Sequence, residues 1–138
     1  MTPTLRGRWQ TRLGLNLTVG VVLTFLLSDV FHDFASAIAV LGYITVLGWG
    51  WDVVYSRLQA WRWDHDWPPI LYLLGAVWEM GVLSILMQTV NLPGVAEGYG
   101  LLAVLLQYSM IGLLSFLLMF GPLRVLFPRW RFRGGQWR

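Results

Sequence analysis

Four long apolar runs separated by short polar segments make up the pattern of the chain. Residues 13–28, 34–51 and 99–120 carry no charge, and residues 68–90 carry a single charge at Glu79. A helix rises about 1.5 Å per residue and a hydrocarbon core is about 30 Å thick, so runs of about 20 residues can span it. The first run is the shortest, and a snorkelling Arg12 with an interfacial Trp9 would extend it. The pattern predicts an all-α integral membrane protein with four transmembrane helices.

The polar segments between the runs predict how these helices are connected. The links at 29–33 and 91–98 are very short, so we expect two antiparallel hairpins, helices 1–2 and helices 3–4. Residues 1–123 would form one transmembrane domain, with an interfacial amphipathic segment at 52–67 between helices 2 and 3. Residues 124–138 would form a cytoplasmic tail rich in arginine and aromatic residues.

Composition supports a membrane protein and excludes several other classes. The 138 residues are 57% apolar and only 12% charged, and the mean hydropathy is +0.59. A soluble domain of this size cannot bury so much apolar side chain, and a disordered chain would be far more polar. The absence of cysteine excludes disulfides and thiolate chemistry.

All ten basic residues are arginines, and their distribution predicts the orientation. In a four-span arrangement every arginine falls on one side of the membrane, which the positive-inside rule identifies as cytoplasmic. Both termini would then be cytoplasmic, in a bacterial cytoplasmic membrane or a bacterial internal membrane of photosynthetic type. A cleaved signal peptide is the alternative for the first run, but its candidate cleavage site at 35–37 lies inside the next run. We therefore expect a retained first helix.

Glu79 lies near the middle of its run, where a charged carboxylate is costly and often functional. Tyr43, Gln107 and Tyr108 are predicted at a similar depth, whereas no arginine is, so we expect no ion pair within one chain. Glu79 would either be a protonated residue that hydrogen-bonds helices together or the centre of a proton or cation site. The first interpretation is favoured, because proton relays normally need several ionisable groups.

The stretch 48–69 contains five of the nine tryptophans. An i,i+4 pair of Arg62 with Asp66 and helical spacing of apolar residues indicate an amphipathic helix, and Asp66 could cap the helix opened by Pro68 and Pro69. Tryptophan, tyrosine and arginine dominate binding hot spots, so the segment is a candidate docking surface, with simple interfacial anchoring as the alternative. The predicted docking residues are Trp51, Asp52, Tyr55, Arg57, Trp61, Arg62, Trp63, Asp64, Asp66 and Trp67.

Metal and cofactor sites have weak support in the sequence. Asp29, His32 and Asp33 would share one helical face and form a weak candidate metal site, with Glu97 as a further ligand. A polar hairpin turn is the favoured alternative. His32 and His65 would lie on opposite membrane faces, which excludes a bis-histidine haem within one chain. No cofactor is predicted.

The tail combines arginines with aromatic residues. This pattern can bind nucleic acid, but directly beside a membrane helix it is more typical of contact with anionic lipid headgroups or an acidic partner surface. We expect lipid or partner contact and no nucleic acid. The tail arginines are Arg124, Arg129, Arg131, Arg133 and Arg138.

The chain shows no Asp-rich phosphatidyltransferase pattern, no paired Ser/His or Ser/Lys at a shared depth and no phosphate-binding glycine loop. We therefore predict a non-catalytic accessory or assembly subunit of a larger membrane complex, in contact with other subunits or with copies of itself. A small oligomeric transporter or channel built around Glu79 is the alternative, and an enzyme comes third.

Overall fold

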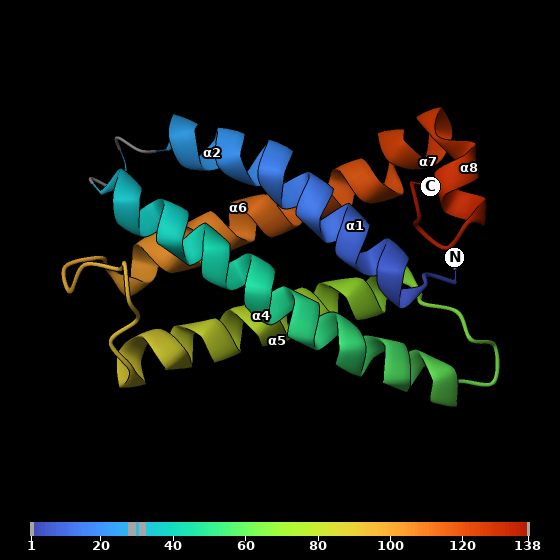
Figure 1. Ribbon diagram of the computed structural model, residues 1–138, viewed down its shortest axis with the longest axis horizontal. Coiled ribbons are helices and arrows are strands. Elements are labelled where there is room, and N and C mark those ends of the chain that lie inside the picture. The colour runs from blue at the N-terminus through green and yellow to red at the C-terminus, as the bar shows by residue number, and fades with distance from the viewer. Residues whose placement is uncertain (1, 28–29, 31–32, 138) are drawn as a thin grey trace.

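The computed structural model describes residues 2–27, 30 and 33–137, and within them the chain is helical with no strand. Figure 1 shows long helices that run roughly side by side, with short helices at the end where both termini lie. Within these described residues, three segments are long and apolar enough to cross a membrane, namely Phe34–Trp61, Pro69–Thr89 and Leu101–Leu126. The prediction of a helical, membrane-type chain is confirmed at this level.

The first helix begins well before the apolar run that predicted it. It comprises α1 (Leu5–Leu15), a π-helical turn η1 (Asn16–Gly20) and α2 (Val21–Leu26), which continue end to end in Figure 1. Thr4 is the N-cap, and its hydroxyl accepts a hydrogen bond from the Gly7 amide at 3.1 Å. The predicted start at residue 13 is therefore wrong, because the cap and not the last charge sets the beginning of the helix.

Helix α4 (Phe34–Trp61) has 28 residues and is the longest element. Asp33 caps its first turn by accepting from the Ser36 amide, and the helix ends before Arg62. The predicted separate interfacial segment at 52–67 is wrong for its first ten residues, which continue the same helix. No glycine or proline interrupts 52–61, so the backbone has no reason to stop there.

The second half of the chain contains α5 (Pro69–Thr89) and α6 (Leu101–Phe120), followed by the short helices α7 (Pro122–Leu126) and α8 (Pro128–Phe132). Each except α6 begins with a proline, whose missing amide proton costs nothing in the first turn of a helix.

The helices pack around one core. Helices α1 and α2 contact α4, α5 packs along α6, and α4 touches both α5 and α6. Many large apolar side chains on the outer surface stay exposed, as expected where the neighbour is lipid. The buried core cluster consists of Ala37, Val40, Leu41, Ile44, Leu83, Tyr99, Val104, Tyr108 and Ile111.

The C-terminal tail folds back onto the start of the chain. The Gly134 carbonyl accepts a hydrogen bond from the Thr4 amide at 2.9 Å. Trp130 is 2% exposed, and its indole Nε1 donates to Thr11 Oγ1 at 3.0 Å. The tail is thus part of the packed structure at this end, where the end of α4 and the start of α5 also lie (Figure 1).

Candidate functional site

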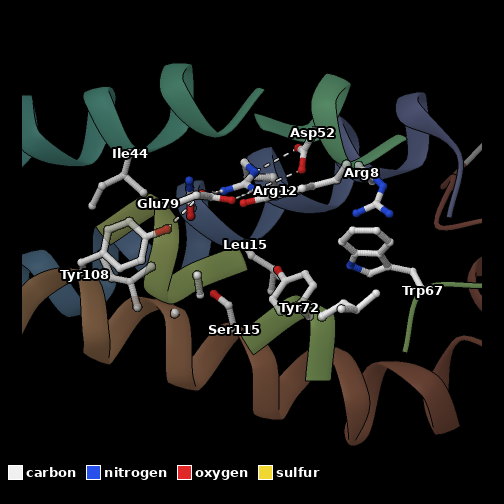
Figure 2. A pocket seen from close by; sticks show the side chains of 16 residues that line it. Arg8, Arg12, Leu15, Ile44, Asp52, Trp67, Tyr72, Glu79, Tyr108 and Ser115 are labelled. Carbon is white, nitrogen blue, oxygen red and sulfur yellow. Dashed lines mark hydrogen bonds and ion pairs between the residues drawn. The ribbon is translucent and has the colours of Figure 1, made fainter. Parts of the chain in front are cut away.

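Arg12 of α1 lies between two buried carboxylates. Its Nε and Nη2 donate to the two oxygens of Asp52 on α4, both at 3.0 Å. Its Nη1 and Nη2 donate to the two oxygens of Glu79 on α5, at 2.9 and 3.1 Å. Asp52 is 3% and Glu79 6% exposed. One guanidinium therefore links three helices through four charge-assisted hydrogen bonds (Figure 2).

The expectation that no arginine reaches Glu79 is wrong. Because the helix starts after Thr4, Arg12 lies about two turns inside it and points into the bundle. Gly48 of α4 makes room for the side chain, since a Cβ at that position would lie 2.4 Å from Arg12 Nη1. The arginine expected to snorkel towards the headgroups is instead paired inside the protein.

Of the three tyrosine and glutamine partners predicted for Glu79, one contacts it. The Tyr108 hydroxyl on α6 donates to Glu79 Oε2 at 2.9 Å. The Tyr43 hydroxyl donates instead to the Pro93 carbonyl at 2.9 Å. Tyr43 therefore holds the 91–98 loop and does not belong to the Glu79 site.

Gln107 belongs to a second buried polar cluster. Its amide nitrogen donates to Thr24 Oγ1 at 3.1 Å and to the Ala37 carbonyl at 2.8 Å. Its amide oxygen accepts from the Tyr99 hydroxyl at 2.9 Å. Burial raises the pKa of Tyr99, in the loop before α6, to about 12, so the phenol stays a donor. This cluster joins α2, α4 and α6 and does not touch Glu79.

Every carboxylate oxygen in the Arg12 site accepts at least one hydrogen bond. Both oxygens of Asp52 and both of Glu79 accept from Arg12, and Tyr108 adds one further donor. Buried carboxylates are tolerated when they are paired and fully hydrogen-bonded. This geometry suits fixing α1, α4 and α5 relative to one another.

Two small cavities adjoin the network. The first has a volume of about 50 Å³ and extends from Glu79 towards Trp67, with Ser115 on its wall (Figure 2). The second, of about 40 Å³, continues towards Trp130 and Gly135 of the tail. The residues shared by both walls are Arg8, Arg12, Asp52, Trp67 and Tyr72.

Arg8 is more deeply buried than Arg12, with 8% of its surface exposed. Its Nη2 donates to Gln59 Oε1 at 2.8 Å, and its guanidinium carbon lies 4.6 Å from the centre of the Trp67 ring. Within the described part of the chain, no carboxylate forms an ion pair with it. The sequence did not identify Arg8 as a site residue, because Arg8 was interpreted only as one of the charges that set the orientation in the membrane.

The end of α4 and the loop after it carry two highly exposed indoles. Trp61 is 84% and Trp63 91% exposed. Arg62 pairs with Asp64 through two hydrogen bonds of 3.0 and 2.9 Å, and not with Asp66 as predicted. The i,i+4 spacing fails because Arg62 lies beyond the helix end. These hydrogen bonds lower the pKa of Asp64 to about 2.

Several other predicted docking residues are not available to a partner. Asp52, Tyr55 and Trp67 are buried, and Tyr55 packs its ring 5.5 Å from that of Trp67. Trp51 is half-buried and stacks on Tyr55 at 6.2 Å. Arg57 is exposed.

Asp66 is partly exposed and does not cap the next helix, because Pro68 holds the N-cap position with no side-chain hydrogen bond.

The tail arginines differ in their surroundings. Arg124 is half-buried and lies 5.7 Å from the centre of the Phe120 ring, whereas Arg129 and Arg133 are exposed. The side chain of Arg131, and Arg138 as a whole, lie outside the described residues.

The weak metal candidate is only partly described. Asp29 and His32 lie outside the described residues. Asp33 is the N-cap of α4, and its hydrogen bonds with Ser36 lower its pKa. Among the residues that the structure describes, no cluster of three histidine or acidic side chains could hold a metal.

The fold and these sites define a helical membrane-type protein with at least three candidate spans and a buried arginine–dicarboxylate centre. No family model, curated protein or solved structure matches the chain.

Proposed function

We propose that the chain is a non-catalytic, four-span accessory or assembly subunit of a larger bacterial membrane complex. It docks through the end of α4 and the loop that follows it. The docking surface, called the tryptophan loop, consists of the exposed indoles of Trp61 and Trp63 and the half-buried pair Arg62 and Asp64. Its partners are other membrane subunits or further copies of the chain, and its exposed arginines contact anionic lipids on the cytoplasmic side.

The fourth span in this proposal is the helix formed by α1, η1 and α2. Residues 5–26 form one continuous rod in Figure 1, and a helix of this length extends about 33 Å, enough to cross a hydrocarbon core. Arg8 is buried, and Arg12 is paired with two carboxylates, so neither presents a bare charge to lipid. With this span, both termini and the tryptophan loop lie on the cytoplasmic side. Reporter fusions that place either terminus outside would contradict the arrangement.

The exposure of the tryptophan loop is the observation that carries the proposal. Two neighbouring indoles at 84% and 91% exposure have almost no contact with their own chain. The arginine between them is held by Asp64 at 2.9 Å and so presents a fixed orientation. Large, exposed aromatic residues beside an ordered arginine match the composition of binding hot spots.

Affinity purification in mild detergent with native lipids tests the proposal. Replacing Trp61 and Trp63 together with alanine should remove stoichiometric partner subunits, or abolish self-association, while the thermal unfolding of the chain stays unchanged. The matched control is Phe25→Ala, which removes a 66% exposed aromatic residue near the far end of the molecule and should leave the complex intact. Equal yields of complex from both variants would leave membrane anchoring as the role of the loop.

The cavity beside Glu79 favours a second candidate, a small oligomeric transporter or channel. In that case Glu79→Gln would abolish proton-coupled flux in liposomes while the protein remains folded. We expect no flux in either protein, because both oxygens of Glu79 already accept hydrogen bonds from Arg12. Flux in the parent that disappears in a folded Gln variant would favour the transporter.

A further inference from the structure

The tail forms an open hollow of about 380 Å³ where the third candidate span ends. Leu126, the last residue of that span, lines the hollow together with Phe127 and Trp137. Ligand pockets in proteins have volumes of roughly 300–1,000 Å³, so the hollow is large enough for a small polar group.

Two arginines line this hollow from one face of the tail. Arg129 lies in α8 and Arg133 directly follows it, and the Arg133 amide donates to the Arg129 carbonyl at 3.0 Å. Residues four apart in such a helical turn lie on the same face, so the two side chains start as neighbours. Both are exposed, and within the described residues neither forms an ion pair or a side-chain hydrogen bond.

The surroundings of these arginines carry no counter-charge. No described residue that lines the hollow is acidic, and residues 98–138 contain no aspartate or glutamate. The hollow is therefore complementary to an anion. A zwitterionic ligand would bring its own cation next to two guanidinium groups, so a net negative charge fits better.

Apolar side chains beside the arginines indicate a lipid as the source of that anion. Val125 and Leu126 are 78% and 69% exposed, where acyl chains can cover them while the headgroup reaches the hollow. An acidic protein surface or a free phosphate would leave both uncovered. The Trp137 ring packs 5.4 Å from that of Phe127 and 6.2 Å from that of Trp130. Tryptophan is enriched at headgroup depth in membrane proteins.

Hydrogen bonds to the start of the chain hold the walls of the hollow in place. The Trp137 amide donates to Gln10 Oε1 at 3.1 Å, and Gln136 Nε2 donates to Thr4 Oγ1 at 2.8 Å. A site on a docked tail loses less conformational entropy on binding than one on a free tail.

We propose that the hollow binds one anionic phospholipid per chain, whose phosphodiester oxygens accept hydrogen bonds from Arg129 and Arg133. Two guanidinium groups on one phosphate are a strong, directional arrangement. The proposal deepens the lipid contact of the proposed function and rests on it for the position of the tail at the cytoplasmic surface. It assigns that contact to one place on the chain, whereas diffuse attraction would use every exposed arginine.

Native mass spectrometry of the detergent-purified chain tests the site, with equal amounts of phosphatidylglycerol and phosphatidylcholine of identical acyl chains. One phosphatidylglycerol per chain should be retained in about tenfold preference, because a choline cation near two guanidinium groups is repelled. Glycerol 3-phosphate should not displace the lipid, since it lacks the acyl chains.

The decisive variant combines Arg129→Gln with Arg133→Gln. It should reduce the retention of phosphatidylglycerol by about tenfold or more, through the loss of hydrogen bonds between charged groups. The matched control, Arg6→Gln with Arg57→Gln, removes two exposed arginines of α1 and α4 and should retain the lipid like the parent chain. If the double tail variant does not fold, Arg129→Gln alone should still reduce retention about fivefold.

Equal retention of the two lipids by the parent chain would overturn the proposal. Equal losses in the tail variant and the control would also overturn it, since they indicate diffuse attraction to surface charge. Displacement of the lipid by a glutamate peptide or by glycerol 3-phosphate would assign the hollow to an acidic protein partner or to free phosphate instead. The variant that tests docking, Trp61→Ala with Trp63→Ala, should retain the lipid like the parent, so each proposal can fail without the other.

Discussion

Replacing Arg12 with methionine should destabilise the chain by about 3–5 kcal/mol, the usual cost of removing one partner from a buried ion pair. Methionine keeps an unbranched, flexible stem but removes all four hydrogen bonds to Asp52 and Glu79. Two carboxylates at 3% and 6% exposure then lose their counter-ion. Tyr108 still donates to Glu79, so the loss is greatest at Asp52.

The free energy of unfolding in detergent, measured by denaturant titration, provides the assay. Glu79→Gln alone should cost about 1.5–3 kcal/mol, the value of a hydrogen bond to a charged group, because Asp52 still neutralises Arg12. The triple variant Arg12→Met, Asp52→Asn, Glu79→Gln should recover most of the stability lost in Arg12→Met, since no buried carboxylate is left without its counter-ion. As a control, Arg57→Met removes an exposed arginine of α4 and should change the stability by less than about 0.5 kcal/mol.

Two results would refute the reasoning. If Arg12→Met unfolds like the parent chain, the arginine does not hold the three helices together. If the triple variant is no more stable than Arg12→Met alone, the loss comes from packing of the arginine stem and not from the two carboxylates.

Two further predictions concern Gly48 and the Arg62–Asp64 pair. Gly48→Ala should displace Arg12 and lower the free energy of unfolding by about 1–3 kcal/mol in the same titration, because the added Cβ would lie too close to Arg12 Nη1. The control Gly50→Ala, whose Cβ meets open space, should raise the free energy of unfolding by about 0.5–1 kcal/mol. Asp64 should titrate at about 2 by carboxyl carbon NMR and return towards about 3.9 in Arg62→Gln. Because the pKa of Asp64 is lowered in the folded chain, the Arg62–Asp64 pair stabilises the loop fully at a pH above the unfolded pKa, and this stabilisation is lost as the pH falls through about 2. An unchanged Asp64 pKa in Arg62→Gln would contradict this prediction.

Hydrophobic patterning located the long helices because α4, α5 and α6 are apolar over the length of a membrane. It misplaced the start of the first helix because an uncharged run was taken as the helix itself. Arg6, Arg8 and Arg12 lie inside that helix, whose beginning is set by the Thr4 cap. The same error hid the ion pair, since an arginine placed at the membrane edge cannot be expected to reach Glu79.

Of the candidate site, the sequence predicted only how deep in the membrane its residues lie. Glu79 and Tyr108 were placed at a similar level, and they are bonded. Depth does not give rotation about the helix axis, and adjacent residues on a helix point about 100° apart. Gln107 and Tyr108 therefore cannot both face Glu79, and Gln107 turns towards Thr24 and Ala37 instead. Burial of Tyr55 and Trp67 depends on tertiary packing, which a loop-like composition does not reveal.

The exclusive use of arginine in this chain has a structural reason at two positions. Arg12 uses three nitrogens in one plane to bond two carboxylates on different helices, and a lysine, with one nitrogen, could not hold both in paired contacts. Arg8 lies over an indole ring while bonding Gln59, which also suits a planar guanidinium. At exposed Arg57 the structure requires only positive charge, so lysine should serve equally there. Arg8 and Arg12 thus contribute to the helix packing through their side-chain bonds, whereas under the positive-inside rule the exposed arginines would be the ones that orient the proposed four-span chain.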